Sequence, residues 1–95
     1  MQVRWTSRAA NDLKAISSHI EQQRNLATAN RVCRIIYGAV QILRRFPESG
    51  KPGIEEGTRE LVVPAMPSYI VAYKVMYSEA IQILCIWHGA QDRRQ

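Results

Sequence analysis

Residues 69–77 read YIVAYKVMY, and this alternation decides the fold class. Tyrosines and valines occupy every second position from Tyr69 to Tyr77. Side chains two residues apart on an extended chain point to the same side, so these residues share one face and those between them share the other. The segment therefore predicts a β-strand over 69–77.

Two further strands flank this segment. Residues 58–63 form a short run that Pro64 stops, because proline has no N–H group to donate to a sheet. On the other side, Ser78-Glu79 makes a tight connection to an apolar run over 80–88. Strands joined by short connections pair antiparallel, so we expect a three-stranded antiparallel meander.

The N-terminal half has a helical period instead. After an extended segment at residues 2–5, the hydroxyls of Thr6 and Ser7 can cap a helix that fades near residues 22–25. A second helix is expected from Leu26 to Phe46-Pro47, followed by a glycine- and proline-rich loop over 50–57. The apolar stripes of the two helices are Ala9, Leu13, Ile16 and Ile20, then Ala29, Val32, Ile36, Ala39, Val40 and Leu43.

These elements predict an α+β fold in the order β-α-α-β-β-β. The N-terminal helical hairpin should pack on one face of a small, mostly antiparallel sheet. The length of 95 residues favours one domain over residues 1–95.

Composition limits the class of partner. Thirteen Lys and Arg residues against eight Asp and Glu give a net charge of +5. That surplus suits a polyanion or an acidic protein, although many small basic domains bind no nucleic acid. No apolar run approaches the length of a membrane span and no signal peptide is recognisable, so we expect a cytoplasmic protein.

The sequence holds no cofactor or metal motif. Cys33 and Cys85 lie in apolar stretches and predict buried thiols rather than a disulfide framework. No Cys/His spacing typical of zinc ligands occurs. We therefore predict neither a metal site nor a bound cofactor.

Three features are candidates for chemistry. Arg59, at the start of a strand, could hold a phosphate or carboxylate, or form an ion pair with Glu55, Glu56 or Glu60. The alternating tyrosines could stack bases, but the valines on their face favour a place in the core. His88, at the end of the last strand, could be a general acid or base, or have a structural or partner-contacting role.

Read in order, the chain resembles the RelE/ParE toxin superfamily over nearly its whole length. The segments that carry the resemblance are WT at 5–6, AANDL at 9–13, ISSHI at 16–20, the helix at 29–43, FPESG at 46–50, GTREL at 57–61, YIVAYKV at 69–75 and ILCIWHGAQ at 83–91. The resemblance implies a toxin of a type II toxin–antitoxin module. It also implies a cognate antitoxin whose flexible tail orders on binding and covers the toxin.

The superfamily divides by target. RelE-like members cut mRNA on the ribosome, whereas ParE-like members poison DNA gyrase. The cleaving members usually carry an Arg before the Tyr of the third strand and a basic residue with a Tyr near the C-terminus. Here Ala72 precedes Tyr73, Gly89 and Ala90 follow His88, and no tyrosine follows Tyr77.

The resemblance therefore favours the ParE branch, associated with plasmid stabilization and growth inhibition. A gyrase poison acts by binding, so it needs no catalytic residues. The contacts that we expect with the target are Arg59, His88, Gln91, Arg93 and Arg94. The alternatives are a ribosome-dependent mRNA endonuclease that uses Arg59 and His88, and an inactive relic that only binds antitoxin.

Overall fold

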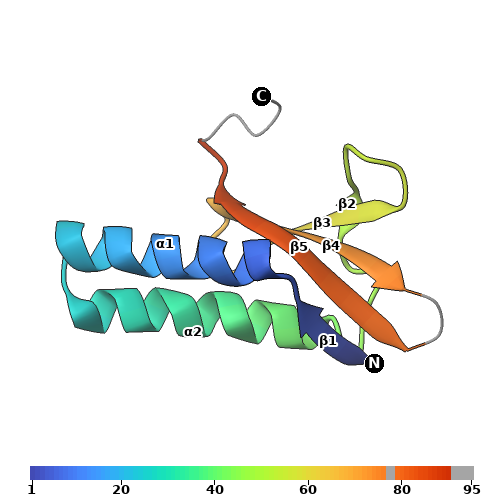
Figure 1. Cartoon of the computed structure of the whole chain (residues 1–95), viewed down its shortest axis with the longest axis horizontal. Helices are drawn as coiled ribbons and strands as arrows, with labels where there is room; N and C mark the ends of the chain where they lie inside the picture. Colours follow the sequence, from blue (N-terminus) through green and yellow to red (C-terminus); the bar gives the residue numbers. More distant parts are fainter. Residues whose placement is uncertain (77–78, 91–95) are drawn as a thin grey trace.

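The computed structural model describes residues 1–76 and 79–90. Its elements follow the predicted order, with one additional short strand (Figure 1). They are β1 (Gln2–Trp5), α1 (Ser7–Gln23), α2 (Leu26–Ile42), β2 (Lys51–Pro52), β3 (Thr58–Val62), β4 (Tyr69–Met76) and β5 (Ala80–His88). The α+β fold with an N-terminal helical hairpin is confirmed.

One five-stranded sheet has the order β1-β5-β4-β3-β2. The strands β3, β4 and β5 form the predicted antiparallel meander. The first strand pairs parallel with the last, in a register that runs from Gln2 opposite Ala80 to Trp5 opposite Ile83. A helical hairpin between β1 and the rest of the sheet makes this long-range parallel pairing possible.

The expectation of an unpaired loop over 50–57 was wrong at its beginning. Lys51 pairs with Glu60 and Pro52 with Arg59, which forms the two-residue strand β2 at the edge of the sheet. Two residues are too few to show an alternation, and proline is tolerated at an edge because its missing N–H faces away from a ladder. The predicted strand end at Tyr77 lies outside the described residues.

Polar side chains begin both helices. The Thr6 Oγ1 accepts a hydrogen bond from the Ala9 N–H at 3.1 Å, and the Asn25 Oδ1 accepts one from the Thr28 N–H at 2.7 Å. Each cap satisfies a backbone donor that has no partner inside its helix. Thr6 is therefore the cap of the first helix among the two hydroxyls that the sequence offered.

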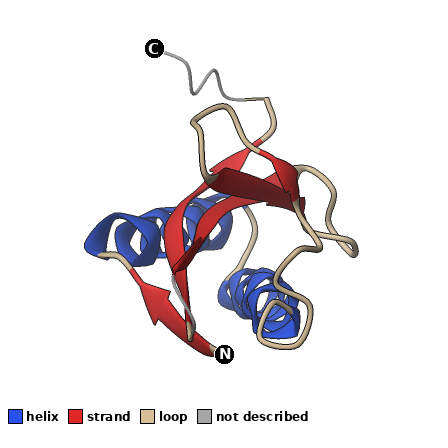
Figure 2. Ribbon diagram, turned by 90° about the vertical axis from the view of Figure 1, so that its right-hand side faces the viewer, coloured by secondary structure: helices blue, strands red, loops and turns tan. Residues whose placement is uncertain are grey.

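The two helices lie antiparallel and side by side, and the sheet runs across them (Figures 1 and 2). Their apolar stripes pack against the tyrosine-and-valine face of β4. The core cluster consists of Ala9, Ile20, Ala29, Val32, Ile36, Ala39, Val40, Leu43, Val63, Val71, Tyr73, Ile81, Ile83 and Ile86. Tyr73 is fully buried, so the core interpretation of this tyrosine is confirmed.

Two side chains at the start of the first helix, those of its cap Thr6 and of Asp12, add hydrogen bonds to β5 at and beyond the end of β1. The Thr6 hydroxyl lies 2.8 Å from the Ile83 carbonyl oxygen and 3.1 Å from that of Leu84. The Asp12 Oδ2 accepts the Ile86 N–H at 2.9 Å. The cap of α1 and a side chain of its second turn thus satisfy polar groups of β5 at and beyond the end of β1. In the part of the chain that the structure describes, no helix has the length and hydropathy of a membrane span.

Candidate functional site

Arg59 holds the loop that joins α2 to the sheet. From β3, its Nη1 donates to the Gly50 carbonyl oxygen at 2.7 Å and, more weakly, to that of Glu48 at 3.4 Å. Its Nη2 lies 3.8 Å from the Glu48 carboxylate. The sequence offered Glu55, Glu56 and Glu60 as ion-pair partners, but the carboxylate that meets the guanidinium is that of Glu48.

Tyr73, on β4, holds the same loop through its hydroxyl. Its hydroxyl donates to the Pro47 carbonyl oxygen and accepts the Gly50 N–H, both at 2.8 Å. Burial raises the pKa of Tyr73, while the Gly50 N–H and the charge of Arg59 act in the lowering direction. A Cβ at Gly50 would lie 2.8 Å from Cε1 of Tyr73, so glycine is required there. We refer to Arg59, Tyr73 and residues 47–50 as the loop clamp.

His88 lies at the far end of the sheet, where β5 ends opposite Tyr69. The two rings meet edge to face, with centroids 5.2 Å apart and an interplanar angle of 86°. The Nδ1 of His88 accepts the Ala90 N–H at 3.1 Å.

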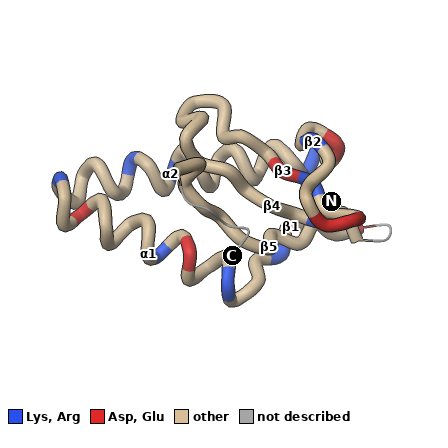
Figure 3. Tube along the Cα trace, turned by 90° about the horizontal axis from the view of Figure 1, so that it is seen from above, with Lys and Arg blue, Asp and Glu red and all other residues tan. Residues whose placement is uncertain are grey.

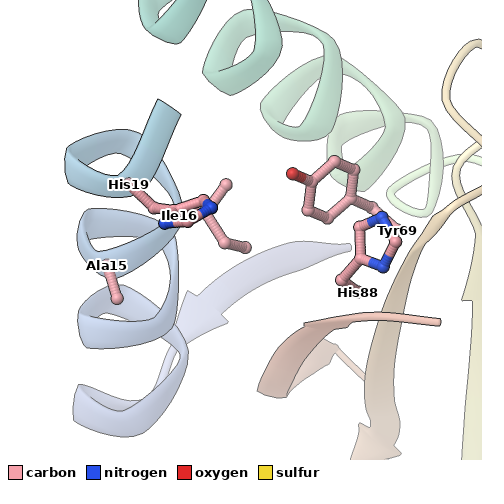
Figure 4. A pocket seen from close by; sticks show the side chains of 5 residues that line it. All are labelled: Ala15, Ile16, His19, Tyr69 and His88. Atoms are coloured by element: carbon pink, nitrogen blue, oxygen red, sulfur yellow. The ribbon is translucent and has the colours of Figure 1, made fainter. Parts of the chain in front are cut away.

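A hollow of about 500 Å³ separates this corner from the first helix. Its lining residues are Ala15, Ile16, His19, Tyr69 and His88. Figure 4 shows His19 on α1 and His88 on β5 on opposite sides of the hollow, with Tyr69 beside His88. Burial, and to a smaller extent Cys33, raises the pKa of Tyr69. The sequence does not predict that His19 and His88 line one hollow, because nothing in their spacing indicates which helix face lies beside which strand end.

The structure does not bring Arg59 and His88 together. Arg59 pairs with Tyr73, whereas His88 pairs with Tyr69, four residues earlier on β4. That offset is about 13 Å along the strand, and Arg59 and His88 also lie on strands on opposite sides of β4. The two predicted site residues therefore occupy separate corners of the molecule.

Three other predicted contacts, Gln91, Arg93 and Arg94, lie outside the described residues. Among the described residues, no group of three or more His, Cys, Asp or Glu side chains is placed to hold a metal ion.

A second hollow, of about 450 Å³, lies between the two helices of the hairpin and reaches β1. It is lined by Trp5, Ala10, Leu13, Lys14, Ser17, Cys33 and Tyr37. The rings of Trp5 and Tyr37 stack at its end, 6.2 Å apart and nearly parallel. Cys85 is buried as expected, but Cys33 is only half-buried, because it lines this groove.

Comparison with known proteins identifies close relatives along the whole chain. Residues 3–93 match the model of the family described as ParE toxin of type II toxin–antitoxin system, parDE. Y4kP of Sinorhizobium fredii, a protein named as a toxin, is 40% identical over 91 residues, which cover 96% of this chain and 91% of the relative. The toxin RelE2 of Caulobacter vibrioides is 38% identical over 90 residues, which cover 95% of this chain and 97% of the relative.

A solved structure has the same fold. It is a chain of the chromosomal ParDE toxin–antitoxin system from P. aeruginosa, with a TM-score of 0.82 and 28% sequence identity. The alignment covers 93% of this chain and 95% of the other. The resemblance to the RelE/ParE superfamily is thus confirmed by sequence and by structure.

Proposed function

Because this chain belongs to the family of ParE toxins of type II toxin–antitoxin systems, we propose that it inhibits growth by binding DNA gyrase and that a cognate antitoxin neutralises it. In this proposal the toxin acts by adhesion to a macromolecule and breaks no covalent bond.

The observation that carries the proposal is the position of Arg59. RNA cleavage needs groups that activate the 2′-hydroxyl, stabilise the phosphorane and protonate the leaving oxygen at one place. The guanidinium of Arg59 is hydrogen-bonded to two carbonyl oxygens of the loop clamp, and the register separates it from His88. Binding does not require these groups to meet.

We place the target-binding surface at the C-terminal corner, with contacts from His88 and from Gln91, Arg93 and Arg94 of the tail. Arg59 stays in the proposed set, but it acts mainly by fixing the loop clamp. The antitoxin should present carboxylates to a chain with a net charge of +5.

One observation favours a second candidate function, cleavage of ribosome-bound mRNA. His19 and His88 face each other across the 500 Å³ hollow, and paired histidines can serve as general base and general acid. The 38% identity with RelE2 of Caulobacter vibrioides supports keeping this candidate. An inactive relic that only binds antitoxin is the third.

Expression of the chain without its antitoxin separates the three. A gyrase poison should stall replication and induce DNA-damage signalling, and the purified toxin should inhibit supercoiling by gyrase. A nuclease should arrest translation and leave transcripts cut within reading frames. A relic should not affect growth.

The variant His88→Ala sharpens the choice. A gyrase poison should keep part of its toxicity, since one contact among several is lost. A nuclease that relies on His88 should lose about 100-fold or more in rate. Complete loss of toxicity by a folded His88→Ala toxin that still binds antitoxin would contradict the gyrase proposal. His19→Ala is the matched variant: it should leave a gyrase poison as toxic as before, and it should inactivate a nuclease that requires both rings.

A further inference from the structure

The outer face of α2 carries an apolar strip that no described element covers. Ile42 is 52% exposed and Phe46 is 58% exposed. The Phe46 N–H donates to the Ile42 carbonyl oxygen at 3.0 Å, so helical spacing continues past the end of α2 and the two side chains follow one another. The buried residues Ile36, Val40 and Leu43 point the other way, into the core.

The end of this strip is held rigidly. The Ser49 hydroxyl and N–H both donate to the Phe46 carbonyl oxygen, at 2.7 Å and 3.1 Å. The loop clamp fixes the residues that follow Phe46. An exposed aromatic side chain on a preorganised backbone loses little conformational freedom on binding, which is what an anchor for a partner needs.

Cations flank the strip on both sides of Gly38. Arg31 and Arg34 precede Gly38 by seven and four residues, so both share its face of the helix, and Arg45 lies in the turn that follows Ile42, beside Phe46. They are exposed, and α2 contains no Asp or Glu; its trace in Figure 3 carries Arg segments and no acidic ones. The Arg45 guanidinium carbon lies 6.0 Å from the centroid of the Phe46 ring.

No contact among the described residues requires glycine at position 38. It lies inside α2, where glycine is a poor residue, and a Cβ built there meets nothing within 4 Å. A small residue at the beginning of an apolar strip lets a partner's backbone come close, because interaxial distances between packed helices depend on the side chains at the crossing.

We infer that the strip formed by Gly38, Ile42 and Phe46, flanked by Arg31, Arg34 and Arg45, docks an acidic amphipathic helix of the antitoxin, which crosses α2 at Gly38. The cationic border selects a partner with carboxylates beside its apolar side chains. This inference rests on the proposed function only in that an antitoxin binds the toxin; it does not depend on which target the toxin poisons.

The test uses the full-length toxin and the antitoxin encoded beside it. Gly38→Leu places a side chain at the crossing point without a clash inside the toxin. Ser18→Leu adds the same side chain on the exposed side of α1, away from the strip. We expect Gly38→Leu to raise the Kd of the complex at least about tenfold and to abolish neutralisation in growing cells, whereas Ser18→Leu stays within about twofold of the unsubstituted toxin. Arg31→Glu with Arg34→Glu should also raise the Kd, most at low salt.

Three results would overturn the inference. The first is a Gly38→Leu toxin that binds antitoxin as tightly as the unsubstituted one. The second is loss of toxicity in Gly38→Leu with unchanged antitoxin binding, which would assign the strip to the target. The third is a free toxin that dimerises and becomes monomeric in Gly38→Leu, which would assign it to a second copy. An unsubstituted toxin that the antitoxin does not bind would instead refute the neutralisation proposed above.

Discussion

The hydroxyl of Tyr73 makes two hydrogen bonds where water does not reach. It bridges the Pro47 carbonyl oxygen and the Gly50 N–H, while Arg59 binds the Gly50 carbonyl oxygen from the other side. A single glycine thus has both of its backbone groups satisfied by side chains of the sheet. At the scale of residues, Tyr73 and Arg59 act through the backbone that they hold, and Phe46 is presented to solvent as a result.

Tyr73→Phe should lower the free energy of unfolding by about 1–3 kcal/mol, because it leaves buried polar groups of the loop without a partner. Urea denaturation followed by circular dichroism measures the loss. Tyr37→Phe, at a half-exposed tyrosine, is the matched control and should change stability by less than about 0.5 kcal/mol. Equal effects of the two substitutions would contradict a special role for the Tyr73 hydroxyl.

The same tyrosine predicts a loss of stability at alkaline pH. Burial raises its pKa above the ordinary value of 10.0, so the folded state favours the neutral hydroxyl. The stabilisation is therefore complete below about pH 10 and is lost as pH rises through the folded-state pKa. Melting temperatures between pH 8 and 11 should fall more steeply for the unsubstituted chain than for Tyr73→Phe. Because Tyr69 is shifted in the same direction, Tyr73→Phe should keep part of the slope.

At the scale of elements, α1 both packs on β5 and completes its hydrogen bonding. Thr6 caps the helix and also donates to β5, and Asp12, one turn into the helix, accepts the Ile86 N–H. The parallel pairing of β1 ends opposite Ile83, where the β4–β5 register also shifts. The helix thus fixes the part of β5 that leads to His88.

Asp12→Ala should destabilise the protein by about 1–3 kcal/mol, because the N–H of the buried residue Ile86 loses its acceptor. Asp12→Asn keeps an oxygen at the same place and should lose less than half as much. Denaturant unfolding of both variants gives the comparison. If Asp12→Asn were as damaging as Asp12→Ala, the charge of Asp12 rather than its hydrogen bond would be the important property.

Elements that are long enough to repeat a hydrophobic pattern could be predicted from the sequence. The alternation at 69–77 and the apolar stripes of the helices identified the sheet and helix layers, because an element with one buried face has apolar residues at regular intervals. Lys51–Pro52 was missed, since a two-residue strand has no period. The sequence also did not predict that His19 and His88 line one hollow, or that Glu48 is the partner of Arg59. Both depend on which helix face and which loop the tertiary fold brings to a strand.

At the scale of the whole molecule, positive charge is spread unevenly. The chain carries a net charge of +5, and α2 has only basic charged residues. A field of one sign over an elongated face attracts an acidic partner before contact is made.

Association of the toxin with its antitoxin should therefore slow as salt rises. We expect the association rate constant to fall by about tenfold or more between 50 and 500 mM NaCl, with a much smaller change in the dissociation rate constant. Stopped-flow mixing measures both. Arg31→Gln with Arg34→Gln should weaken the salt dependence of the association rate constant. An association rate constant of the unsubstituted toxin that does not change with salt would rule out electrostatic steering.

The pairing of the first strand with the last has a consequence for the newborn chain. During translation, β1 leaves the ribosome first but finds its neighbour only when residues 80–83 have been added. The helical hairpin, whose contacts are local, can form well before that moment. A ribosome that stalls before β5 would release a fragment with the hairpin, and with the α2 face, but without a closed sheet or the His88 corner. If the target binds at the His88 corner and the antitoxin on the α2 face, as proposed above, unfinished copies would be harmless and would still bind the antitoxin.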